Sequence, residues 1–262
     1  MGSSRRLAWE LVRQRVKVRL AYRADFLALA ASNLMLAGVG MSLLLALFQH
    51  LDQLGRYTAS DMLFSWGFAE CAVGAFYVIF GGLYALNQRY ILGGELDRVL
   101  LRPLHPLAQV LLDNVSLEDL PTVGFGLVVM ALVAPGLPAI ALWKWLLLPL
   151  LLASATAVLG GVLTLISSAG FHLHHRGTAV GLVFQLSTFS RYPMDLFASP
   201  LRLALTFVLP IGFAGFYPAS LFLGRTEWTA YALASPIVGS VCLAAGLAGW
   251  RVGLDRYTSS GT

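Results

Sequence analysis

The chain has 262 residues, of which 58% are hydrophobic and only 12% are charged. Soluble domains carry about a quarter charged residues and somewhat under half apolar ones, so this composition excludes an ordinary cytosolic enzyme. With only two cysteines, Cys71 and Cys242, a disulfide-rich secreted scaffold is excluded as well. We therefore predict an all-α integral membrane protein.

Long apolar runs predict six membrane-spanning helices, because a helix needs about 20 apolar residues to cross the hydrocarbon core. Five of these runs cover residues 24–48, 62–84, 108–134, 142–171 and 229–250. The intervening segment 177–223 is apolar but contains four prolines. We expect a fifth span that ends near Tyr192, followed by a re-entrant helical hairpin over about 193–224. Interrupted backbone at membrane depth must be buried in protein or face water.

The basic residues predict the orientation of these spans. On this assignment, 13 of the 18 Lys and Arg residues fall on the side that carries both termini, and 5 fall on the other side. The positive-inside rule then places both termini in the cytoplasm. Residues 1–23 are predicted to form a basic amphipathic helix on the anionic inner leaflet. The six-span domain would cover 24–252, and 253–262 would be a cytoplasmic tail.

The sequence lacks the common catalytic and nucleotide-binding motifs. It contains no GxxxxGK[ST] phosphate loop, no HExxH, no GxSxG and no Cys-x-x-Cys pair. We expect no catalytic residue, no metal site and no cofactor bound by this chain. His172, His174 and His175 have no Cys, Asp or Glu beside them to complete a zinc shell, so we interpret them as interfacial histidines. The net charge of +5 follows from topology and does not indicate nucleic-acid binding.

The loop between the second and third spans predicts a short helix over about 94–104. A Gly-Gly pair precedes it, acidic residues occupy its first turn and basic residues its last, as the helix dipole favours. Prolines then end it. Leu96, Val99 and Leu100 would form one apolar face. From the residues alone, this helix either lies on lipid headgroups or is gripped by another protein.

The string GELDRVLLRPLHP at 94–106 resembles the G-E-L-D-x-x-L-x-R-P-L-x-P motif of permease subunits of bacterial type 2 ABC exporters. The branch in question includes viologen and drug efflux permeases. The segments 20–26, 191–195, 205–210 and 217–219 are also similar to this family, so the resemblance extends over most of the chain. His105 stands where the family usually has asparagine.

The resemblance implies a half-transporter in the bacterial cytoplasmic (inner) membrane. A second permease, often a non-identical homologue and otherwise a second copy of this chain, would complete the pathway, and a separate ATPase dimer would bind ATP and Mg²⁺. Membrane lipids would surround the assembly, which would export a hydrophobic or cationic small molecule such as a drug, a viologen-like compound or a lipid-like metabolite. The short helix would be the coupling helix that contacts the ATPase. Its implied coupling residues are Gly94, Glu95, Asp97, Arg98, Leu101 and Arg102.

The second span carries a carboxylate within a stripe of small residues. Gly67, Glu70, Gly74, Tyr77 and Gly81 share one helix face, and small residues let helices approach closely. Because a carboxylate at this depth costs a few kcal/mol, it should face a partner or a wet cavity. Glu70 is either a path residue that attracts a cationic substrate or a structural carboxyl hydrogen-bonded across the permease interface.

The fifth span offers a second polar stripe near its predicted outer end. Arg191 and Asp195 are four residues apart, and we predict that they form an ion pair, with a gating role as the alternative. The acidic residues Asp113, Glu118 and Asp119 are expected to pair with nearby arginines. Together with the second span, this stripe gives the candidate substrate-path residues Glu70, Tyr77, Gln185, Thr188, Arg191 and Asp195.

A stand-alone secondary transporter driven by an ion gradient is the alternative function. Interrupted helices suit such proteins, which use them at their binding sites. However, only one region of this chain is interrupted, and the first half has no counterpart.

Overall fold

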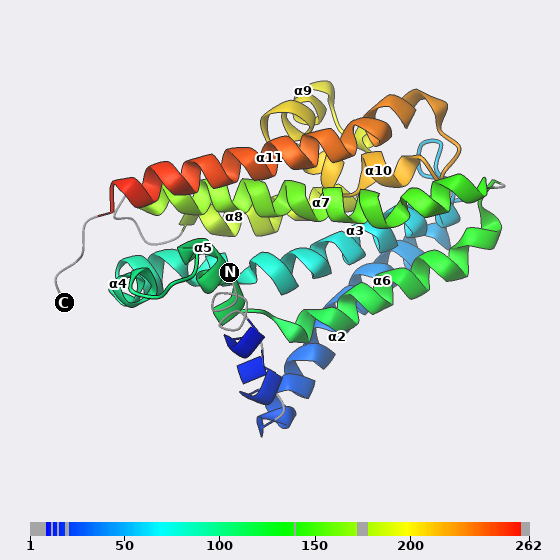
Figure 1. Ribbon diagram of the computed structural model, residues 1–262. Helices are drawn as coiled ribbons and strands as arrows, with labels where there is room; N and C mark the ends of the chain where they lie inside the picture. The colour runs from blue at the N-terminus through cyan, green and yellow to red at the C-terminus, as the bar shows by residue number, and fades with distance from the viewer. Residues whose placement is uncertain are drawn as a thin grey trace.

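The computed structural model describes residues 9–11, 13–14, 16–18, 21–138, 140–171 and 178–257. Within these ranges the regular structure is helical, with no β-strand. Five helices are long and apolar enough to cross a membrane: Arg23–Phe48, Ala59–Ile91, Leu117–Gly136, Leu142–Phe171 and Thr226–Asp255. A multi-pass helical membrane protein is therefore the architecture of the described chain (Figure 1).

The first half of the chain contains α2 (Arg23–Phe48), α3 (Ala59–Phe80), α4 (Glu95–Leu100), α5 (Pro106–Asp113) and α6 (Leu120–Val133). The 3-10 turn η1 (Gly81–Ala85) and the π-helical turn η2 (Leu86–Ile91) extend α3, and η3 (Leu117–Asp119) leads into α6. The second half contains η4 (Ala134–Gly136), α7 (Leu142–Ser168), η5 (Ala169–Phe171), α8 (Thr178–Ser187), η6 (Thr188–Arg191), η7 (Met194–Leu196), α9 (Ser199–Leu203), η8 (Ala204–Val208), η9 (Ile211–Ala214), α10 (Phe216–Ser220), η10 (Thr226–Trp228) and α11 (Thr229–Asp255).

Four of the predicted spans correspond to helices of the structure. The first and fourth agree to within one residue, whereas the second covers 59–91 instead of 62–84 and the last covers 226–255 instead of 229–250. The third span differs, because α5 and α6 are separate helices and the spanning segment begins at Leu117. The break lies at Asn114, whose side-chain amide donates to the Tyr90 hydroxyl at 2.7 Å and to the carbonyl of Val110 at 3.0 Å. Residues 106–113 therefore pack under α3 and beside α4 instead of starting the third span.

Close helix contacts at glycines build the central bundle. Helix α3 contacts α6 and α7, and α7 contacts α11 along its length (Figure 1). At Gly67 a β-carbon would lie 2.9 Å from the carbonyl oxygen of Gly126, and one at Gly161 would collide with the backbone of Cys242. The glycine stripe of the second span thus faces α6 of the same chain, which confirms the predicted close helix approach.

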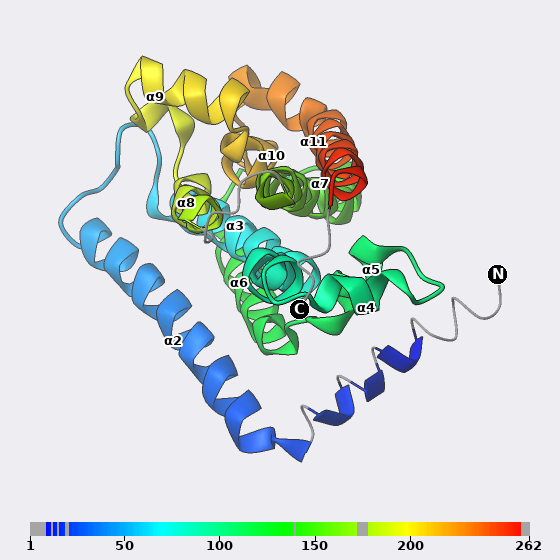
Figure 2. The same cartoon turned by 90° about the vertical axis from the view of Figure 1, so that its left-hand side faces the viewer.

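Helix α2 stands apart from this bundle (Figure 2). Only Ala30, Ala37 and Leu44 are buried along its length. Its contacts are with α6, η3 and α3. Most of its apolar side chains are therefore left without a partner inside the chain.

The segment after α7 is made of short helices. Helix α8 and η6 together cover residues 178–191, which is shorter than the other spans, so the six-span count remains a prediction. In the predicted hairpin, α9 and η8 form one short apolar helix, Ser199–Val208, whereas α10 is wholly buried. Tyr217 of α10 shares a 2.7 Å hydrogen bond with Thr206 and stacks on Tyr231 of α11.

Several predicted features lie wholly or partly outside the described residues. His172, His174 and His175 are outside them, as are much of the predicted N-terminal helix 1–23 and the end of the tail. The described pieces at 9–11, 13–14 and 16–18 are helical, and the predicted N-terminal amphipathic helix stays a prediction.

Candidate functional site

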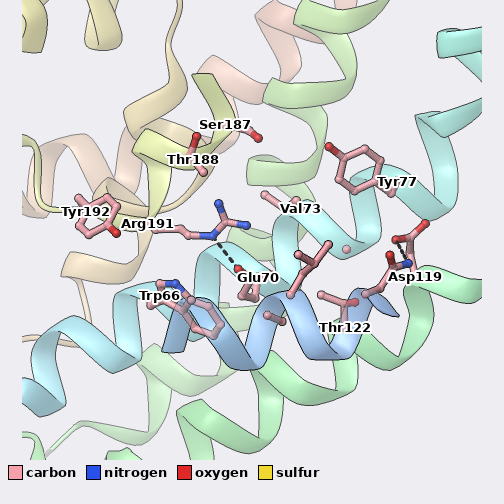
Figure 3. Close-up of a pocket in the computed structure, with 15 residues that line it drawn as sticks. Trp66, Glu70, Val73, Tyr77, Asp119, Thr122, Ser187, Thr188, Arg191 and Tyr192 are labelled. Atoms are coloured by element: carbon pink, nitrogen blue, oxygen red, sulfur yellow. Dashed lines mark hydrogen bonds and ion pairs between the residues drawn. The ribbon is translucent and has the colours of Figure 1, made fainter. Parts of the chain in front are cut away.

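A cavity of about 290 Å³ lies between α2, α3, the start of α6 and η6 (Figure 3). Glu70 and Tyr77 line it near the middle of the 33-residue helix 59–91. Apolar and polar side chains alternate around it. Its lining residues are Asn33, Leu36, Ala37, Gly40, Trp66, Glu70, Val73, Gly74, Tyr77, Asp119, Thr122, Ser187, Thr188, Arg191 and Tyr192.

A buried ion pair crosses the cavity. Arg191 Nε lies 2.6 Å from Glu70 Oε1, and the side chains are 17% and 4% exposed (Figure 3). The predicted pair between Arg191 and Asp195 is wrong. Helix η6 ends at Arg191, and Tyr192 and Pro193 then adopt extended backbone, so Asp195 does not follow Arg191 on one helix face.

Asp195 belongs instead to a network at the end of the bundle where α3 begins. Its carboxylate accepts hydrogen bonds from Arg56 Nη2 and from the Tyr57 hydroxyl, both at 2.8 Å. Arg56 also contacts Glu227 at 2.7 Å, and Arg225 Nη2 lies 3.3 Å from Asp61 Oδ2. Burial and the hydrogen bond to Asp195 raise the pKa of Tyr57 above its ordinary value. This network ties the α2–α3 loop to η7 and η10.

Asp119 lies at another edge of the cavity. Its Oδ1 accepts a 2.9 Å hydrogen bond from the side-chain amide of Asn33 on α2. Of the three acidic residues expected to pair with arginine, Asp113 does so, with 4.0 Å between its Oδ2 and Arg102 Nη1. Among the described residues, no Lys, Arg or His forms an ion pair with Asp119. The nearby Thr122 hydroxyl is buried and has no hydrogen-bond partner there either.

The structure brings together four of the six predicted path residues. Glu70, Tyr77, Thr188 and Arg191 all line the cavity. Gln185 is exposed outside it, and Asp195 is part of the network described above. Asn33, Trp66 and Thr122 also line the cavity, and no motif in the sequence distinguishes them as lining residues.

A second candidate site is α4, at the opposite end of α3 from the Asp195 network. Gly94 precedes α4 with φ of 71°, a left-handed conformation that glycine adopts at little cost. Leu96 and Val99 are buried against the protein, and Gln109 Nε2 donates to the carbonyls of Val99 at 2.9 Å and Leu104 at 2.6 Å. Helix α4 is therefore held against α5 by its buried apolar side chains and by the hydrogen bonds from Gln109.

The apolar face of α4 differs from the predicted one. Leu100 is 43% exposed, so it does not belong to the buried face with Leu96 and Val99. Leu101, which follows the helix, is 87% exposed and is the most exposed large apolar side chain of the described residues. Figure 1 places α4 and α5 together at one end of the molecule. The exposed side chain of Leu101, with the partly exposed Leu100 beside it, thus lies at that end.

Most charged residues of α4 have partners within the chain. Glu95 Oε2 lies 2.7 Å from Arg89 Nε, and Arg102 approaches Asp113 as noted. Burial and the neighbouring Asp97 carboxylate raise the pKa of the Tyr257 hydroxyl, which places Asp97 beside the end of α11. Of the predicted coupling residues, Arg98 and Leu101 are exposed, and Arg98 forms no ion pair within the described part of the chain.

Comparison with known proteins gives one family match. The family model described as "ABC-2 family transporter protein" matches residues 34–261, which is most of the chain. No curated protein and no solved structure shows significant similarity to it.

Proposed function

The chain belongs to the ABC-2 transporter family, and from this premise we propose that it is the transmembrane permease subunit of an ATP-driven exporter. It would work in the bacterial cytoplasmic membrane with a second permease, which is either a non-identical homologue or a second copy of this chain. Both termini would face the cytoplasm. ATP and Mg²⁺ would bind to a separate ATPase dimer, since this sequence has no phosphate-binding loop.

The exposed tip of α4 is the observation that carries this proposal. An exposed apolar residue on a rigid, anchored helix suits a protein groove, because binding interfaces are built around a central aromatic or aliphatic anchor that fills a pocket. Leu101 would be that anchor, and Arg98 and Leu100 would lie at its rim. The buried Leu96 and Val99 would pass the movement of the ATPase to α5 and α3.

The cavity beside Glu70 and Arg191 would be part of the substrate path. Its mixed lining suits a hydrophobic or cationic small molecule. ATP-driven movement would change the affinity of the path for that molecule, as any switch requires. Because Glu70 is paired with Arg191, its charge is already balanced within the chain.

The test is purification of the tagged chain from native membranes, identification of co-purifying subunits by mass spectrometry, and an ATPase assay. We expect an ATPase to co-purify and Leu101→Asp to abolish the association. Leu51→Asp is the matched control, because Leu51 is an exposed leucine in the loop at the other end of α3.

Changing Asp97 and Arg102 together is a weaker test, because both contact other parts of this chain and their loss would also disturb α4. If the chain is recovered alone and without ATP hydrolysis, the exporter proposal fails and transport driven by an ion gradient becomes the alternative.

A further inference from the structure

The charges that line the cavity do not balance. Glu70 and Arg191 neutralise each other at 2.6 Å. Asp119 adds one negative charge, and among the described residues its side-chain hydrogen bond comes from the neutral amide of Asn33 at 2.9 Å. The neighbouring Glu118 is a buried carboxyl that does not line the cavity, so it supplies no positive charge that could balance Asp119. Among the described residues, the lining therefore carries a net formal charge of one negative unit.

A carboxylate in such surroundings needs a counter-ion. Isolated charges within a membrane are costly and are normally paired. The buried Thr122 hydroxyl, also without a partner among the described residues, is a second polar group left open at the same place. In Figure 3, Asp119, Thr122 and Tyr77 lie at one end of the cavity. The missing partner is thus a group that carries positive charge.

Apart from Asn33, Ser187 and Thr188, the rest of the lining is apolar, aromatic or glycine. Leu36 and Ala37 of α2 face Trp66 and Val73 of α3 across the cavity. Aromatic faces attract organic cations and contribute about 0.5–2 kcal/mol when the site is desolvated. A strongly hydrated inorganic ion would gain nothing from this surface, whereas an organic cation with an apolar body would contact it throughout.

Exposed residues border the cavity on the side of α2 and η6. Leu36 is 69% exposed and Tyr192 is 39% exposed, and Thr188 beside Tyr192 is also exposed. Because α2 stands apart from the bundle, this side of the cavity faces away from the bundle core (Figure 2). A molecule dissolved in the bilayer could reach the cavity here without crossing the core of α3 and α7.

From these observations we infer that the cavity between α2, α3, α6 and η6 binds a small lipophilic organic monocation, with Asp119 as its counter-ion. The inference rests on the transport proposal in one respect, that the bound molecule is substrate, and it narrows the substrate class. One positive charge balances the lining, so a neutral molecule leaves Asp119 unpaired. A dication would bring a second positive charge near Arg191, and the lining offers no further carboxylate to balance it.

The test is direct binding to the purified chain in nanodiscs, without any ATPase. Tritiated phenyltrimethylammonium is the probe, and tert-butylbenzene is its neutral isostere. We expect saturable binding that the isostere does not displace. Asp119→Asn should weaken binding on the order of tenfold or more, because it removes one partner of a desolvated charge pair. Asparagine keeps an acceptor for Asn33, so this variant preserves the local hydrogen bond.

Two further variants control for folding and for general charge. Asp119→Glu restores the charge and should restore most of the affinity. Asp113→Asn removes a carboxylate that lies outside the cavity and should leave binding unchanged. The inference is overturned if the wild type does not bind the cation, if Asp119→Asn binds it equally well, or if tert-butylbenzene displaces it. None of these results bears on ATPase association at α4, which the co-purification tests separately.

Discussion

Helices α2 and α3 are neighbours in sequence but are held in opposite ways. Helix α3 is buried along most of its length and approaches α6 at glycines, whereas α2 has three buried residues. The link between α2 and the start of α6 includes the polar contact from Asn33 to Asp119. The cavity therefore has one rigid wall and one weakly held wall. Such an arrangement lets a site change shape without unfolding the bundle.

The largest expected effect comes from breaking the ion pair on the rigid side. Arg191→Met should lower the free energy of unfolding by about 3 kcal/mol, because it leaves the buried Glu70 carboxylate without a partner. The double variant Glu70→Gln/Arg191→Met should recover much of this loss. Unfolding by SDS titration in mixed micelles measures both.

The matched change on the α2 side is Asn33→Ala, which removes a partly buried hydrogen bond. We expect it to cost about 1 kcal/mol. If it destabilises the protein as much as Arg191→Met, the two walls are equally fixed and the contrast between them is wrong.

Glycine substitutions sharpen the same comparison. Gly161→Val should destabilise the protein by about 1–3 kcal/mol, because a side chain there meets the backbone of α11 at Cys242. Gly38→Val on α2 is the control, since no atom lies within 4 Å of its added β-carbon. Thermal unfolding of both variants gives the ranking, and equal melting temperatures would contradict the described packing of α7 on α11.

A smaller effect is expected in the Asp195 network. Asp195→Asn should cost about 1 kcal/mol, because it weakens charge-assisted bonds to Arg56 and Tyr57 in a partly exposed site. Glu227→Gln, which changes a more exposed partner of Arg56, should cost less. The same unfolding titration separates them, and the reverse order would show that Glu227 is the principal partner.

Alkaline pH should reveal how much Tyr57 contributes to the free energy of unfolding. Its pKa is raised in the folded protein, so the unfolded tyrosine ionises first as the pH rises above about 10. The stability that Tyr57 provides is therefore present below that pH and is lost above it. Between pH 9 and 11 we expect the wild type to lose about 1 kcal/mol more than Tyr57→Phe. Parallel pH profiles would contradict this.

The sequence predicts the parts of the structure that depend on local pattern. Apolar length locates α2, α7 and α11, and the glycine and proline residues around α4 set its limits. The glycine stripe of α3 predicts a close helix contact, although not that α6 is the partner. The start of the third span is misplaced because the side chain of Asn114 ends α5 through tertiary contacts with Tyr90.

The contacts of the candidate site depend on residues that are far apart in the sequence. Glu70 and Arg191 are separated by 121 positions, and Arg56 and Asp195 by 139. The spacing rule that pairs Arg191 with Asp195 assumes a continuous helix, and the extended backbone at Tyr192 and Pro193 removes that condition. Pairs of this kind can be identified only in the three-dimensional structure, because the sequence alone indicates only which charges lie within one turn of the same helix.

The most direct test of the central claim is site-specific cross-linking at Leu101. The chain has two native cysteines, of which Cys71 is buried and Cys242 is half-buried, so Leu101→Cys adds a far more exposed thiol. Treatment of native membranes with a maleimide–diazirine cross-linker and light, which needs no cysteine on the partner, followed by mass spectrometry of the adduct, identifies what contacts α4. We predict an adduct with an ATPase subunit for Leu101→Cys and none for Leu51→Cys. Absence of an ATPase adduct at Leu101, or the same adduct at both positions, would contradict the assignment of α4 as the ATPase contact.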